Sequence, residues 1–110
     1  MPKLNIDQLV KQMQSAALGV FKENVPSVKR YVETEFKKLG DTILMIEKAK
    51  LAGEIDEQEA RTLIDMQKNA MRSVMLTVEG LGIVMVEKAI NAALRIVKDV
   101  VNSGIGFKLL

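Results

Sequence analysis

The sequence contains no cysteine, histidine or tryptophan, and these absences exclude whole classes of chemistry. Without cysteine there is no disulfide, no thiolate zinc site and no thiol nucleophile. Without histidine there is no Ser-His-Asp triad, no imidazole metal ligand and no Glu-x-x-His di-iron site. The glycine motifs of phosphate-binding loops and of the nucleophile elbow are also missing. We therefore expect no enzymatic activity, no metal site and no cofactor.

Proline, aromatic residues and long apolar runs are scarce as well. Both prolines lie within the first 26 residues, so the rest of the chain lacks the strongest helix breaker. Aromatic residues make up 4%, which is few for a β-sandwich or barrel and leaves no stacking platform for single-stranded nucleic acid. No stretch reaches the roughly 18 uncharged apolar residues of a membrane span, and a secretory pattern is lacking at the start. These features predict an all-α, cytoplasmic protein that binds no nucleic acid.

What the sequence does contain is a high proportion of apolar residues in a charged helical chain. Hydrophobic residues make up 48% and charged residues 27%, and the mean hydropathy is +0.11. The 16 basic and 14 acidic residues are interleaved, which gives a net charge of only +2 and no bias toward polyanions. At this length we expect one helical domain covering residues 1–110.

Capping residues mark the helix boundaries in the first half of the chain. Asn5 precedes an apolar stripe of helical spacing and Gln8 follows it by three positions, as in a capping box. At Asn24-Val25-Pro26-Ser27 the helical pattern is interrupted, because proline lacks an N–H donor and disfavours helical geometry in the residue before it. The sequence predicts helices over about residues 5–24 and 26–52, with Pro26 as a kink, hinge or break between them.

The second of these helices has a single apolar face and a clear end. Its face carries Val28, Val32, Phe36, Leu39, Ile43 and Ile46. Gly53 suits the left-handed position after a helix, and Asp56 with Glu59 suits a capping box at the start of the next one. Residues 46–67 resemble the short helical hairpins appended to many bacterial proteins, which share Gly-x-Ile, a capping residue and an acidic helix start. The resemblance implies a helix-turn-helix whose turn contains Gly53 and Asp56.

The second half of the chain is interpreted as one very long helix over residues 57–103, followed by an apolar tail, 104–110. It contains no proline, and Glu79 is the only charge between residues 73 and 86. From residue 87 onward the polar residues form one narrow stripe. A helix that is apolar over most of its circumference has to be buried against protein or lipid.

This apolar half predicts a long antiparallel hairpin that completes a helical bundle by self-association. Folding about residues 53–55 brings position i opposite roughly position 108 − i, so Pro26 faces Gly82 and Lys29 faces Glu79. Each arm would be about 70 Å long at 1.5 Å per residue. Two helices cannot bury an apolar surface this wide, so we expect a dimeric four-helix bundle or a larger, filamentous assembly.

The same register brings small residues together and suggests where subunits meet. Residues 15–19 face residues 89–93, which permits close helix approach, and Gly80 near Pro26 serves as a second hinge. The predicted oligomer interface is Val74, Val78, Leu81, Gly82, Met85, Ala89, Ala93, Ile96, Val97 and Val100. The alternative topology folds the first helix back at Pro26 and leaves a three-helix unit with a protruding apolar C-terminal half.

Two carboxylates and several methionines lie in this apolar half. We expect Glu79 to pair with Lys29 or Arg30, and Glu87 with Lys22, because a carboxylate in apolar surroundings gains from a cationic partner. The core of the long helix is expected to be filled in part by Met71, Met75 and Met85.

These patterns predict a non-enzymatic structural or interaction protein that forms homo-oligomers. Its expected partner is a second copy of the chain, with another helical protein as a further option. The tail at 104–110 is a candidate for reaching into a neighbouring subunit. The alternative hypothesis is a membrane-associated helical protein that inserts its apolar C-terminal half, which the small residues suit and which Glu79 and Glu87 oppose.

Overall fold

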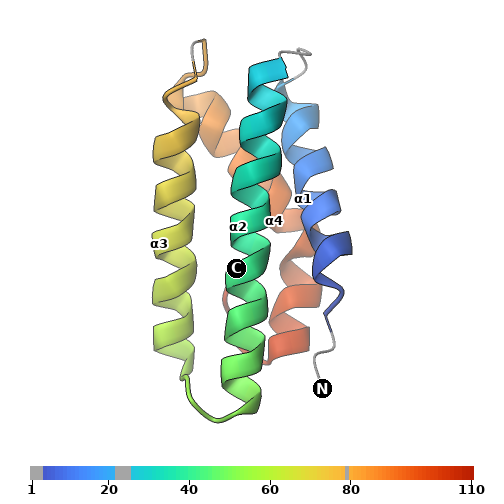
Figure 1. Ribbon diagram of the computed structural model, residues 1–110, viewed down its shortest axis with the longest axis vertical. Helices are drawn as coiled ribbons and strands as arrows, with labels where there is room; N and C mark the ends of the chain where they lie inside the picture. Colours follow the sequence, from blue (N-terminus) through green and yellow to red (C-terminus); the bar gives the residue numbers. More distant parts are fainter. Residues whose placement is uncertain (1–3, 22–25, 79) are drawn as a thin grey trace.

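The computed structural model describes residues 4–21, 26–78 and 80–110. These residues form four helices and no strand, which confirms the all-α prediction (Figure 1). The helices are α1 (Ile6–Phe21), α2 (Pro26–Leu51), α3 (Glu57–Met75) and α4 (Ile83–Ile105). Each helix runs antiparallel to the one before it, and the bundle measures 43 × 22 × 18 Å.

Two of the expected helix starts are confirmed by their capping hydrogen bonds. The Gln8 amide donates to Asn5 Oδ1 at 3.2 Å directly before α1 begins. At the start of α3 the Glu59 amide donates to Asp56 Oδ1 at 2.7 Å, and the Asp56 amide donates to Glu59 Oε1 at 3.2 Å. Gly53 has a φ of +70°, the left-handed value expected of a glycine after a helix. The α2–α3 turn is therefore built as its sequence indicates.

The prediction of a single helix over 57–103 is wrong. α3 ends at Met75, and the chain reverses before α4 begins at Ile83. Gly80 takes a φ of +91°, which a residue with a side chain rarely adopts, and Gly82 is extended as the N-cap of α4. This reversal lets α4 bury its apolar face against its own chain. The 70 Å arms are therefore also wrong, since the whole bundle is 43 Å long.

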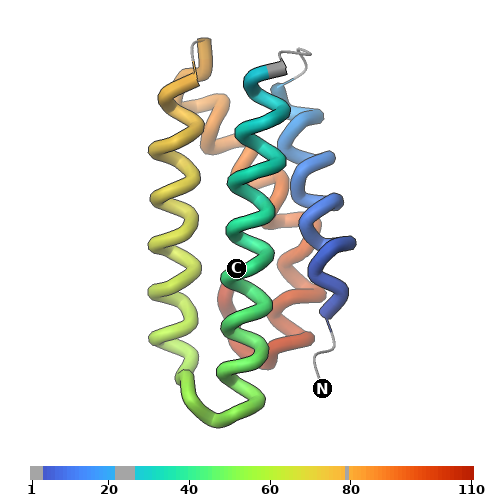
Figure 2. The backbone as a smooth tube through the Cα atoms, in the orientation of Figure 1, coloured from blue at the N-terminus to red at the C-terminus, as the bar shows by residue number. Residues whose placement is uncertain are grey.

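The route of the first helix differs from the predicted hairpin as well. α1 packs against both α2 and α4, so it folds back beside α2 and does not extend it (Figure 2). Pro26 is the first residue of α2, while residues 22–25 lie outside the described part. A Cβ at Gly40 of α2 would clash with Val10 of α1, which shows how closely these two helices approach. The alternative topology had α1 folded back but left the C-terminal half protruding, whereas α4 closes the bundle.

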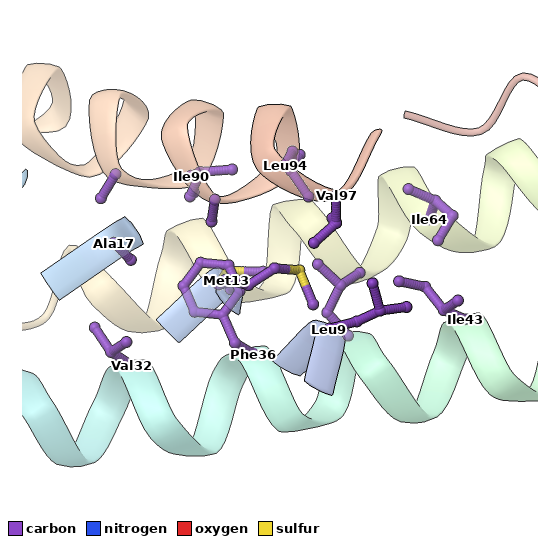
Figure 3. Packing of buried hydrophobic residues seen from close by; sticks show 14 of the residues in the cluster. Leu9, Met13, Ala17, Val32, Phe36, Ile43, Ile64, Ile90, Leu94 and Val97 are labelled. Atoms are coloured by element: carbon purple, nitrogen blue, oxygen red, sulfur yellow. The ribbon is translucent and has the colours of Figure 1, made fainter. Parts of the chain in front are cut away.

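Side chains from all four helices form the core (Figure 3). Every member of the predicted α2 face is at most 3% exposed. α1 adds Leu9, Met13, Ala17 and Phe21, and α3 adds Ala60, Ile64, Met71 and Met75. α4 contributes the largest set: Val86, Ala89, Ile90, Ala93, Leu94, Val97, Val101 and Ile105. Met71 and Met75 fill the core as expected, whereas Met85 is 40% exposed and that expectation is wrong.

The C-terminal tail packs on its own bundle. α4 ends at Ile105, slightly later than expected, and Gly106 follows with a φ of +88°. The amides of Leu109 and Leu110 donate to Asn102 Oδ1 at 3.0 and 3.1 Å, and Leu109 is buried. The tail is thus held by α4 and does not reach outward, contrary to the expectation that it enters a neighbouring subunit.

Candidate interaction surface

The structure divides the predicted interface residues between the inside and the outside of one bundle. Val78, Ala89, Ala93 and Val97 are buried, so they contact their own chain. Val74 and Leu81 are half-buried. The exposed members are Gly82, Met85, Ile96 and Val100. The buried members cannot meet a partner unless the bundle opens.

The exposed aliphatic residues of α4 lie along one side of that helix. Ile96 and Val100 are each 56% exposed, and Met85 is exposed as well. Ala92, which is half-buried, lies between them at helical spacing. Residues three, four, seven and eleven positions apart share a face of an α-helix. We call this surface the α4 outer stripe: Met85, Ala92, Ile96 and Val100.

The position of the stripe on the bundle follows from contacts of its neighbours. Glu87 forms an ion pair with Arg72, so that edge of α4 points toward α3. The outer stripe is offset from Glu87 by roughly half a turn of helix and therefore lies on the other edge. Gln14 of α1 donates to the Glu33 carbonyl of α2 at 3.0 Å, so this edge of α1 faces α2. The opposite edge of α1 is therefore the one nearer α4.

That edge of α1 carries no charge. Gln12, Ser15 and Gly19 are exposed there, and a side chain added at Gly19 would meet no atom within 4 Å. On the side toward α1, the outer stripe of α4 is thus bordered by neutral, small or amide-bearing residues. A partner helix lying along the stripe would not have to desolvate charges on α1, whose burial is costly when they are unpaired.

The ion pair of Glu87 differs from the expected one. Its partner is Arg72 of α3, whose guanidinium also donates to Asn69 Oδ1 at 2.6 Å. The expected partner, Lys22, lies outside the described residues, as does Glu79 with its expected bond to Lys29 or Arg30. Sequence reasoning missed this ion pair because Arg72 and Glu87 lie far apart on the single long helix that the sequence predicts. They meet only because the chain reverses after Met75.

Among the described residues, the buried carboxylates are Glu35 and Glu47, which both lie on α2 and have structural roles. Glu35 pairs with Lys38 Nζ at 3.1 Å. Glu47 Oε2 accepts the Leu4 amide at 3.2 Å, which ties the segment before α1 to α2. Within the described ranges, no three His, Cys, Asp or Glu side chains converge as a metal site would require. The described surface therefore presents apolar contact area and no constellation of reactive groups.

A second exposed apolar group lies at one end of the bundle. Leu76, Ile83 and Val84 are 40–67% exposed around the reversal between α3 and α4. α2 begins at this same end (Figure 1), and its Lys29 and Arg30 are exposed. We call Leu76, Ile83 and Val84 the loop-end cluster. Lys29 and Arg30 thus place positive charge at the same end of the bundle as this cluster.

No protein-family model, curated protein or solved structure matches the chain. Among the described helices, none is both long and apolar enough to cross a bilayer.

Proposed function

We propose that this chain is a non-enzymatic interaction protein that associates with further copies of itself through the α4 outer stripe. The observation that carries the proposal is the exposure of Ile96, Val100 and Met85 on one face of a helix whose other face is fully buried. Single exposed aliphatic residues are common on folded proteins. A row of them beside an alanine, next to an uncharged edge of α1, is the pattern of a helix-packing surface.

The proposed association adds to a core that the chain has already closed. The buried faces of all four helices meet within one copy, so self-association does not complete the fold. Burying the remaining exposed half of each stripe side chain contributes about 1 kcal/mol. Because association also costs several kcal/mol of rigid-body entropy, we propose a concentration-dependent assembly. A cytoplasmic location belongs to the same proposal, since a cysteine-free chain suits a reducing compartment.

Light-scattering mass after size exclusion, measured over a range of loading concentrations, tests this proposal. We expect the wild-type mass to rise from monomer toward a defined multimer. Ile96→Glu should keep the chain monomeric, because a carboxylate in a packed helix interface would lose its hydration. The matched control is Thr34→Glu, an exposed position on α2, and it should assemble as the wild type does. A wild-type chain that remains monomeric at the highest attainable concentration would contradict the proposal.

A second candidate function is contact with a membrane surface, and the loop-end cluster favours it. Leu76, Ile83 and Val84 could enter the headgroup region while Lys29 and Arg30 meet anionic lipid. This mode of membrane contact does not require the C-terminal half to insert into the bilayer. Insertion would require the side chains of that half to leave the core. Co-sedimentation with phosphatidylserine-containing vesicles tests it. Binding that is lost in Ile83→Glu and kept in Ile96→Glu would support the membrane function, and no binding by the wild type would exclude it.

A further inference from the structure

Two opposite charges lie within the surface proposed for self-association. Lys88 and Asp99 are both exposed on α4, and their spacing of about three helical turns places them on the same side of the helix. That side is the one occupied by Ala92 and Ile96. Neither Lys88 nor Asp99 forms an ion pair with another described residue. This side of α4 therefore carries Lys88 near its start, Asp99 near its end and a second cation, Arg95, between them, and Arg95 likewise forms no ion pair with another described residue.

This charge order determines how two identical copies can lie against each other. In a two-fold symmetric interface, residue i contacts residue j and residue j contacts residue i. If two α4 helices met in parallel, Lys88 would face Lys88 and Asp99 would face Asp99. If they meet antiparallel, each Lys88 faces Asp99 of the other copy. Like charges brought together at an interface are strongly disfavoured, so the antiparallel arrangement is selected.

The sizes of the side chains agree with the same register. With Lys88 opposite Asp99 of the second copy, Ala92 comes opposite Arg95, and Met85 comes opposite Asn102. The small Ala92 side chain leaves room for the longer Arg95 side chain, which lets the two helices approach closely. Because the arrangement is symmetric, each of these contacts occurs twice.

From charge and size together, and resting on the self-association proposed above, we infer that a second copy of this chain docks antiparallel along α4. The two-fold axis passes near residues 93–94, and Lys88 of each copy pairs with Asp99 of the other. The ion pairs contribute orientation more than affinity, since exposed pairs are worth at most about 1 kcal/mol each. Affinity comes from Ala92 and Ile96, which lie between the ion pairs, and from Met85 beyond them.

Charge reversal tests the arrangement through the dimer dissociation constant, measured by sedimentation equilibrium. We expect Lys88→Asp and Asp99→Lys each to weaken dimerisation about tenfold, because each creates two repulsive contacts per dimer. The double variant Lys88→Asp/Asp99→Lys should return to within about threefold of wild type. Lys98→Asp on another side of the same helix is the matched control and should have no effect. At a concentration where the wild type is monomeric, none of the reversals should lower the melting temperature, because all three residues are exposed.

The absence of cysteine allows an independent test by cross-linking. Ala92→Cys should form a covalent dimer with a short thiol cross-linker, whereas Thr34→Cys on α2 should not. A chain that dimerises without responding to charge reversal, and that does not cross-link through position 92, would overturn the antiparallel arrangement and leave self-association standing. A wild-type chain that never dimerises would overturn both.

Discussion

The inner face and the outer stripe of α4 both present aliphatic side chains, but in opposite environments. The inner face, with Ala93 and Val97, is fully buried. The outer face, with Ala92 and Val100, is half-buried or exposed. Apolar content alone therefore does not separate the residues that stabilise the fold from those available to a partner. The difference lies in which side of the helix meets α1, α2 and α3.

Neighbouring alanines give the largest expected contrast between these faces. Ala93→Glu places a carboxylate at a fully buried position without a cation, and we expect it to lower the free energy of unfolding by about 3–5 kcal/mol or to prevent folding. Ala92→Glu should remain within about 1 kcal/mol of wild type and instead abolish dimerisation. Urea unfolding followed by circular dichroism measures the first effect, and light scattering measures the second. Equal stability losses in the two variants would mean that the faces are not distinct.

A pair of valines repeats the comparison without introducing charge. Val97→Ala removes two buried methyl groups and leaves a cavity, so we expect a loss of about 2 kcal/mol in the free energy of unfolding. Val100→Ala removes the same atoms from a side chain that is 56% exposed and should cost under about 0.5 kcal/mol. Chemical denaturation under monomeric conditions gives both values. A large loss of stability in Val100→Ala would indicate that the outer face is covered by other parts of the same chain even in the monomer.

Local signals predicted the first part of the fold well because each acts over a few residues. The α2 face is fully buried, and the caps at Asn5 and Asp56 form as their spacing indicates.

Leu4 packs against Gly104, and these two positions are also opposite in the predicted register of the hairpin. The antiparallel approach of the two ends of the chain is thus present in the bundle, reached by a different route.

The reversal after Met75 was missed because no proline or capping side chain marks it. Thr77 and Val78 are poor helix formers, and two glycines follow, yet without a proline the pattern predicts a continuous helix with a close crossing at Gly82. Whether α4 continues α3 or turns back depends on which arrangement buries more apolar surface, and that is a property of the whole chain. The division of the interface residues into inner and outer sets depends on that same choice.

Asn102, which is half-buried near the end of α4, offers the next smaller test. Its Oδ1 accepts two backbone amides of the tail, and its side-chain amide donates to the Leu110 carbonyl at 3.4 Å. Asn102→Ala leaves these amides without an acceptor and should lower the free energy of unfolding by about 1–2 kcal/mol. Hydrogen exchange should show faster exchange at Leu109 and Leu110 while the inner face of α4 stays protected. Unchanged exchange there would mean that other contacts hold the tail.

The smallest expected effects distinguish the two glycines of the reversal that brings α4 against the bundle. Gly80 has a φ of +91°, so Gly80→Ala places a side chain in left-handed backbone and should cost about 1 kcal/mol. Gly82 has a φ of −92° in an extended conformation that any residue adopts, and a Cβ there meets no atom within 4 Å. Gly82→Ala should therefore change the free energy of unfolding by under about 0.5 kcal/mol and leave assembly intact. If Gly82→Ala instead disrupts assembly, the partner contacts the start of α4. The assembly would then not depend on contact along Ala92 and Ile96.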